Sequence, residues 1–200
     1  MEAYLKMNVK VFQFNGCNKC FHETILLSKE SKMTVDYIKD PKEWKEEKID
    51  VAVISGYLLP DDKTILSKIQ KNAGKIIAYG DCTTTGGIFA LANQKGANIT
   101  PITKIIPESI KINSCLGEIE ELINAIKDEE GEKLKQLCRV CKRRSTCEYL
   151  DQVKRQIDLY ENEGACFNDL GFLCNGYIAT ECKERCIDYG TQCRGCNRSF

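Results

Sequence analysis

The sequence has little that would place it in a membrane or on nucleic acid. It contains no run of 18 apolar residues, and its first residues, MEAYLKMNVKVFQF, lack the basic and then apolar segments of an export signal. The formal net charge is zero, because 29 basic side chains balance 29 acidic ones. We therefore expect a cytoplasmic protein without membrane insertion and without a nucleic-acid partner. The pair Arg143 and Arg144 is interpreted as two solvated charges.

Histidine is almost absent, since His22 is the only one in 200 residues. Metal sites that mix cysteine and histidine are therefore nearly excluded, and His22 is expected at the surface or an interface. Cysteine is abundant instead, with 13 residues. Disulfides are rare in the reducing cytosol, so metal ligation is the leading explanation. Twelve thiolates would fill three four-cysteine clusters and leave one cysteine over.

The first part of the chain alternates short apolar runs with amphipathic segments. This alternation predicts an α/β domain, with a parallel sheet whose strands are joined by crossover helices. A loop containing Pro101 and Pro107 is expected before the last helix. The predicted strands are Val9–Phe14, Val35–Ile38, Val51–Ser55 and Lys75–Tyr79, and the predicted helices are Glu23–Lys29, Asp61–Lys71, one that begins near Ile88, and Leu116–Lys127.

The hydrophilic stretch at residues 128–131 is a candidate domain boundary. We expect residues 1–129 to form the sheet domain and residues 130–200 to form a small, irregular, cysteine-rich domain. Nine of the thirteen cysteines lie between Cys138 and Cys196, so this part should depend on metal more than on an apolar core. One amphipathic helix is predicted there, at about Glu148–Tyr160.

Four cysteines of the first part lie beside the ends of predicted elements. Cys17 and Cys20 follow the first strand, Cys82 follows the strand Lys75–Tyr79, and Cys115 precedes the last helix. Ligands of an open parallel sheet bind outside the carboxyl ends of its strands, so these loops can converge on one four-thiolate cluster. The alternative is that Cys82 and Cys115 are ordinary buried thiols.

Glycines and one carboxylate accompany these cysteines. Gly16, Gly86 and Gly87 can adopt positive φ and let the backbone approach an inorganic sulfur, where N–H groups would tune the cluster's potential. Glu23, near the start of a predicted helix, is a candidate proton relay. The alternative for Glu23 is an acidic first-turn residue favoured by the helix dipole.

The remaining cysteines are dense enough to indicate metal by themselves. Two four-cysteine zinc sites would fold this region equally well, so zinc stays open beside iron–sulfur at this point. The spacing comprises one C-x2-C pair, an isolated cysteine and a long closing series: Cys138, Cys141, Cys147, Cys166, Cys174, Cys182, Cys186, Cys193 and Cys196.

Four motifs resemble the small (gamma or delta) subunits of archaeal-type nickel–iron hydrogenases. The run CFNDLGFLCNGYIATECKERCIDYGTQCRGC, residues 166–196, is similar to the C-terminal iron–sulfur module of F420-reducing and F420-non-reducing hydrogenases and of sulfhydrogenases. GCNKC at 16–20, GDCTTTGGI at 80–88 and NSCLGE at 113–118 resemble that family's G-C-x-G-C, G-x-C-x-x-x-G-G-I and G-C-P-P motifs. The family is related to the 20 kDa subunit of NADH:ubiquinone oxidoreductase.

The resemblance implies a flavodoxin-like domain followed by a small domain, with three [4Fe–4S] clusters in all. It leaves Cys147 as the spare cysteine. The implied ligands are Cys17, Cys20, Cys82 and Cys115 for the proximal cluster; Cys182, Cys186, Cys193 and Cys196 for the medial cluster; and Cys138, Cys141, Cys166 and Cys174 for the distal cluster.

By the same resemblance the chain would relay electrons between a large catalytic subunit with a nickel–iron centre and an acceptor subunit that carries iron–sulfur or flavin. Three departures lie in the proximal motifs: Lys19 replaces the usual glycine, Leu116-Gly117 replace two prolines, and the threonine run at 83–85 is unusual. Another low-potential reductase or activation complex without nickel is therefore an alternative function. A zinc-stabilised interaction module is a second alternative.

Overall fold

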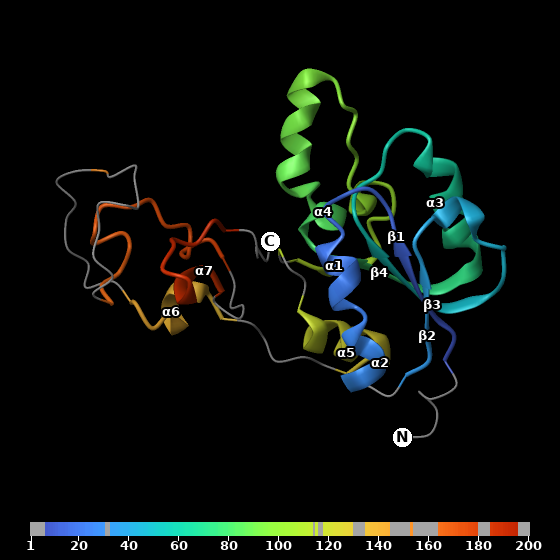
Figure 1. Cartoon of the computed structure of the whole chain (residues 1–200), viewed down its shortest axis with the longest axis horizontal. Helices are drawn as coiled ribbons and strands as arrows, with labels where there is room; N and C mark the ends of the chain where they lie inside the picture. Colours follow the sequence, from blue (N-terminus) through green and yellow to red (C-terminus); the bar gives the residue numbers. More distant parts are fainter. Residues whose placement is uncertain are drawn as a thin grey trace. The chain divides into compact units, whose positions relative to one another are not determined.

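The computed structural model describes residues 7–30, 33–113, 115, 118–129, 135–144, 153, 164–179 and 185–195. Two compact units make up the chain, Met1–Gly131 and Glu132–Phe200, and each is treated by itself below (Figure 1). The division falls at the end of the hydrophilic stretch 128–131. Within the described part of the chain, no helix is long and apolar enough to cross a membrane.

The first unit contains one sheet of five parallel strands in the order β2-β1-β3-β4-β5. This is the flavodoxin-like order, in which the chain changes direction across the sheet between β1 and β3. The α/β fold predicted from the sequence is confirmed. The strands are β1 (Val9–Gln13), β2 (Val35–Ile38), β3 (Ile49–Ser55), β4 (Ala73–Tyr79) and β5 (Ile110–Ile112).

Both faces of the sheet are covered, because successive side chains of a strand point to opposite sides. On one side, Val11 and Val53 pack with Phe21 of α1 (Lys19–Glu23), with α2 (Leu26–Glu30) and with α5 (Ile119–Lys127). On the other side, Phe12 and Ile54 pack with α3 (Asp62–Asn72). The unit therefore has two apolar cores that stabilise it independently of any metal.

The predicted helices occur, with shifted ends. The helix predicted at Glu23–Lys29 is two short helices, because the Thr24 hydroxyl donates to the Phe21 carbonyl at 2.6 Å and ends α1. Helix α3 confirms the prediction at Asp61–Lys71, and α5 starts at Ile119, three residues later than predicted. The segment predicted as a helix from near Ile88 is a 3₁₀ helix, Gly87–Lys95.

Strand β5 was missed in the sequence, where this segment was interpreted as loop. It has only three residues and follows Pro107, so it lacks a run long enough to show alternation. Its pairing with β4 (Ile77 with Ile110, and Tyr79 with Ile112) fixes its place in the sheet. The consequence is functional, since β5 brings the chain to Cys115 at the same edge where β1 and β4 end.

The second unit has a much smaller core. Its described helices are single turns, α6 (Leu137–Val140) and α7 (Arg185–Asp188), and the helix predicted at about Glu148–Tyr160 lies outside the described residues apart from Val153. Two cysteines belong to this core, so the apolar packing and the candidate metal ligands are the same structure. The core is formed by Leu137, Phe167, Phe172, Cys174, Ala179, Ile187 and Cys193.

One carboxylate of the first unit should make its stability depend on pH. Burial, and then the charge of Glu118, raise the pKa of Glu121 to about 7, so the folded state holds a proton that the unfolded state releases near pH 4.5. Stability from this group is full below pH 4.5 and is lost as the pH rises to 7. Glu121→Gln should therefore stabilise the unit at pH 8, by about 1 kcal/mol after allowance for partial exposure.

Urea unfolding followed by fluorescence of Trp44 measures this effect. Trp44 is the only tryptophan, is 7% exposed and packs edge-on against Phe12 in the sheet core, so it reports on the first unit alone. Glu120→Gln, at an exposed position of the same helix, is the control and should change the pH dependence little. The prediction would be contradicted if the free energy of unfolding of Glu121→Gln fell between pH 5 and 8 as steeply as that of the unmodified protein.

Candidate metal centres

The first candidate centre lies at the carboxyl edge of the sheet. Cys17 follows β1, Cys20 is in α1, Cys82 is in α4 (Asp81–Thr84) directly after β4, and Cys115 follows β5. Figure 1 shows α1 and α4 at the same end of the sheet. The fold thus brings together cysteines that are up to 98 positions apart, as an open parallel sheet does with its loops.

The pKa of Cys82 reflects the other thiols near it. Burial, and then the charges of Cys20, Cys17, Cys115 and Asp81, together raise its pKa to about 12. Four thiolates gathered in this way repel one another, so the charged form of the set requires a positive group among them. A set of four thiols is the donor set of an iron–sulfur cluster.

The backbone around these thiols is shaped by glycine. Gly16, Gly86 and Gly87 all have positive φ, at 151°, 88° and 53°. A Cβ on Gly87 would lie 3.4 Å from the Cys82 Sγ, so glycine keeps the space beside this sulfur free. The backbone conformation foreseen for the three glycines is thus present.

Gly56, which follows β3, was missed in the sequence. It lines the small pocket of Cys17, Cys20 and Cys82, and its φ is 91°. A Cβ there would lie 2.4 Å from the Asn15 carbonyl oxygen. The available signal was its position, since a glycine directly after a buried strand lies at the sheet edge where ligands bind.

Replacing this glycine should destabilise the first unit strongly. Gly56→Ala adds a backbone clash to an unfavourable φ and should cost about 3 kcal/mol of unfolding free energy. Gly96→Ala is the matched control, because its φ is also positive, at 81°, but no atom lies within 4 Å of the added Cβ. Trp44 fluorescence in urea measures both, and the control should lose about 1 kcal/mol. Equal losses in the two variants would contradict the steric argument.

A set of hydrogen bonds fixes the loop that carries Cys17. Asn15 and Tyr57 exchange backbone hydrogen bonds of 3.2 and 2.8 Å, and the Asn15 side-chain amide donates to Asp62 Oδ2 at 2.6 Å. The same oxygen accepts from the Leu59 N–H at 2.8 Å, and Asp62 is 8% exposed. Asp62 is therefore a positioning residue for this loop. Sequence reasoning missed it, because an Asp at the start of a helix looks like an ordinary first-turn residue.

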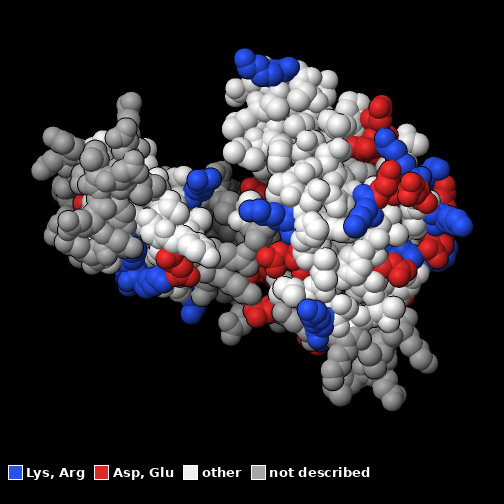
Figure 2. All heavy atoms as spheres, in the orientation of Figure 1, with Lys and Arg blue, Asp and Glu red and all other residues white. Residues whose placement is uncertain are grey.

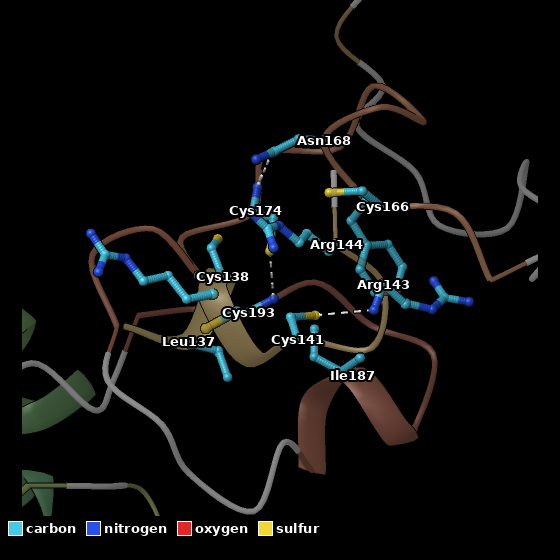
Figure 3. A pocket seen from close by; sticks show the side chains of 13 residues that line it. Leu137, Cys138, Cys141, Arg143, Arg144, Cys166, Asn168, Cys174, Ile187 and Cys193 are labelled. Carbon is cyan, nitrogen blue, oxygen red and sulfur yellow. Dashed lines mark hydrogen bonds between the residues drawn. The ribbon is translucent and has the colours of Figure 1, made fainter. Parts of the chain in front are cut away.

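The second candidate centre is a pocket of about 220 Å³ within the second unit (Figure 3). Burial, and then Cys174, Cys166 and Cys141, raise the pKa of Cys138. These are the four cysteines assigned to the distal cluster by resemblance, and the structure brings them to one pocket. Cys193 also lines it.

Backbone N–H groups point at the sulfurs of this pocket. The N–H of Arg143 donates to Cys141 Sγ at 3.4 Å, and that of Cys193 donates to Cys174 Sγ at 3.3 Å, as the dashed lines in Figure 3 show. The Gly195 N–H donates to Cys193 Sγ at 3.3 Å. Such donors stabilise thiolates and tune the potential of a bound cluster.

Arg143 is not the solvated charge expected from the sequence. It is 7% exposed, and its Cζ lies 4.4 Å from the centre of the Phe167 ring, a cation–π contact. The contact ties the segment of Cys141 to that of Cys166. The interpretation was wrong for Arg143 because sequence alone does not show which arginine packs on an aromatic ring, and it was right for Arg144, which is exposed.

The remaining residues that were singled out in the sequence are placed in several parts of the structure. His22 is exposed, as expected. Glu23 is the last residue of α1, so the interpretation as a first-turn acid is wrong, and its role as a relay stays a prediction. Cys186 lies in α7, while Cys147, Cys182 and Cys196 lie outside the described residues. Among the described residues, no three or more Cys, His, Asp or Glu side chains are spaced to hold a single metal ion.

Known proteins resemble this chain over most of its length. It is 26% identical to a vhu subunit of the F420-non-reducing hydrogenase of Methanocaldococcus jannaschii, over 96% of this chain and 82% of that protein. It is 23% identical to the iron-sulfur subunit of the F420-non-reducing hydrogenase of Archaeoglobus profundus, over 79% of this chain and 67% of that protein.

A structural comparison and a family model give further matches. A chain of the NAD+-reducing [NiFe]-hydrogenase in the H2-reduced state matches with a TM-score of 0.53 and 19% identity, over 64% of this chain and 95% of that chain, which shows a shared fold. The family model described as the 20 kDa subunit of NADH ubiquinone oxidoreductase matches residues 6–128, more than half of the chain. The chain therefore belongs to the family of the NADH ubiquinone oxidoreductase 20 kDa subunit.

Proposed function

We propose that this chain is the iron–sulfur electron-transfer subunit of a complex of the nickel–iron hydrogenase type. It would relay electrons between the active site of a large subunit and an acceptor subunit that holds iron–sulfur or flavin. The main support is the gathering of Cys17, Cys20, Cys82 and Cys115 at the carboxyl edge of the sheet, within the segment that carries the family match. We place the complex in the cytoplasm.

Three [4Fe–4S] clusters would supply one-electron chemistry at these sites. The chain's own residues hold the clusters, donate hydrogen bonds to their sulfurs and exclude water. Gly16, Gly86 and Gly87 allow the backbone to approach the first cluster, and Glu23 would relay protons beside it. The ligands would be Cys17, Cys20, Cys82 and Cys115 for the proximal cluster; Cys182, Cys186, Cys193 and Cys196 for the medial cluster; and Cys138, Cys141, Cys166 and Cys174 for the distal cluster, with Cys147 free.

The proposed clusters are divided between the two units. Residues 1–129 would form the domain of the proximal cluster, and residues 130–200 the domain of the medial and distal clusters.

A second candidate function keeps the clusters without nickel. Lys19 and Leu116-Gly117 depart from the hydrogenase-like motifs beside the proximal cysteines, which favours a different low-potential reductase or activation complex. In that case a cluster held by the same four thiolates would receive electrons from another kind of large subunit.

Anaerobic purification of the chain with its partners, followed by metal and sulfide analysis, tests these functions. About twelve irons per chain, with nickel in a co-purifying large subunit, is the expected result. Full iron and sulfide without nickel would favour the second candidate. Zinc without sulfide would overturn both.

A further inference from the structure

Arg143 differs from the two other described arginines that line the pocket of the second unit, because it is buried. It is 7% exposed, whereas Arg139 and Arg144 are exposed. Figure 2 shows other basic side chains, together with acidic ones, on the visible surface of this unit, where water surrounds them. Water and salt screen an exposed charge but act little on a buried one. The charge of Arg143 therefore acts on the pocket more strongly than an equally near charge at the surface.

Arg143 contacts the segments of two candidate ligands. Its backbone N–H donates to Cys141 Sγ at 3.4 Å (Figure 3), and its Cζ lies 4.4 Å from the centre of the ring of Phe167, the residue after Cys166. Phe167 is 1% exposed and packs edge-on against Phe172, with 6.5 Å between the ring centres. The core thus fixes the ring, and the ring fixes the guanidinium in one place.

A positive charge held beside a cluster favours the reduced form of that cluster. Reduction adds one negative charge, and the potential of a cluster depends on the charge around it, on hydrogen bonds to its sulfurs and on exposure to water. Burial strengthens the attraction, because no water lies between the charges to weaken it. A buried guanidinium in turn needs negative charge or acceptors near it, and thiolates that hold a cluster would supply them.

We propose that Arg143 is a positioning residue whose guanidinium holds the segment of Cys141 to that of Cys166 and raises the reduction potential of the cluster in this pocket. This inference rests on the proposed function, which supplies the cluster. It assigns control of the potential to a residue that is not a ligand. On reduction, one electron enters the cluster from an external donor, and no bond or proton changes place.

An anaerobic redox titration followed by low-temperature electron paramagnetic resonance measures the potential. The purified complex is reduced stepwise with dithionite in the presence of redox mediators. The signal that is lost in Cys138→Ala identifies the cluster of this pocket, and the other clusters in the same sample are an internal reference. The rate at which the protein loses iron to a chelator is measured beside the potential, because it reports how firmly the two segments are held together.

Three variants separate the charge of Arg143 from its packing, and all of them keep the backbone N–H that donates to Cys141. Arg143→Met retains apolar contact with the ring but no charge, so the equilibrium constant for reduction should fall about tenfold, or about 59 mV for one electron. Iron loss should be about tenfold faster. Arg143→Lys keeps the charge and should stay within about threefold of the unmodified protein in both measurements. Arg139→Met, at an exposed position, is the control and should shift the equilibrium constant by less than about threefold.

The outcomes separate this role from the function on which it depends. Iron and sulfide are measured in every variant. A loaded Arg143→Met with an unchanged potential, or with the same shift as Arg139→Met, overturns the proposal alone. If Arg143→Met loses about four irons while Arg143→Lys keeps them, the positive charge is required and the proposal is supported. Equal loss of iron in both variants shows that shape matters instead of charge and overturns it. An unmodified complex without iron and sulfide overturns the proposed function as well.

Discussion

Removal of iron should unfold the second unit and leave the sheet of the first unit intact. The second unit's described core is small, and Cys174 and Cys193 are two of its members, 8% and 6% exposed. Without a bound cluster these cysteines would lose the bonds that connect their segments, and little apolar packing would remain to hold the unit together. The first unit has a core on each face of its sheet and needs no metal to fold.

Hydrogen exchange of the whole chain, before and after anaerobic chelation, measures this difference. Peptides around α6 and residues 166–179 should lose protection by several orders of magnitude on iron removal. Peptides from β1 and β3 should keep theirs, and Trp44 fluorescence should stay that of a buried indole. The prediction is wrong if both units lose protection together, or if the second unit keeps its protection without iron.

Replacing Cys82 should remove one cluster selectively and stop the relay. Cys82→Ala takes away the thiol whose pKa the other three cysteines of the first set all raise, so about four of twelve irons should be lost. Electron transfer from the large subunit should fall by at least about 100-fold, since the first carrier is missing. Cys138→Ala should also lose about four irons, but from the second unit.

Cys147→Ala is the control for both variants, because Cys147 is the cysteine that the proposed clusters do not need. It should keep full iron and normal rates. Iron analysis, together with the low-temperature electron paramagnetic resonance spectrum, distinguishes which cluster each variant has lost. Retention of all the iron in Cys82→Ala would contradict the proximal assignment, and loss of iron in Cys147→Ala would contradict the partition.

Much of the fold could be predicted from the sequence where a pattern is local and long. Helix α5 was found because apolar residues recur at helical spacing, and strands β1 and β3 were found because each contains a short apolar run. Strand β5 was missed because three residues carry no periodicity. The break at Thr24 was missed because it depends on one side-chain hydrogen bond.

The candidate sites, like the fold, could be predicted from the sequence only in part. Cysteine spacing and the family resemblance selected the thiols that the structure places around Cys82 and Cys138. Gly56, Asp62 and Arg143 were not foreseen, because each acts on a residue far away in the sequence or on an aromatic ring whose position only the fold defines. The sequence thus reveals candidate ligands more readily than the residues that hold them in place.

The order of the strands also determines when the first site can exist. Cys17 and Cys20 leave the ribosome early, but Cys115 follows β5, which takes its place at the sheet edge beside β4. The four thiols can therefore meet only after nearly the whole first unit has been synthesised and its sheet has formed. Insertion of a cluster at this site would therefore come late in the synthesis of the chain, and a truncated product that ends before Cys115 would lack the fourth thiol.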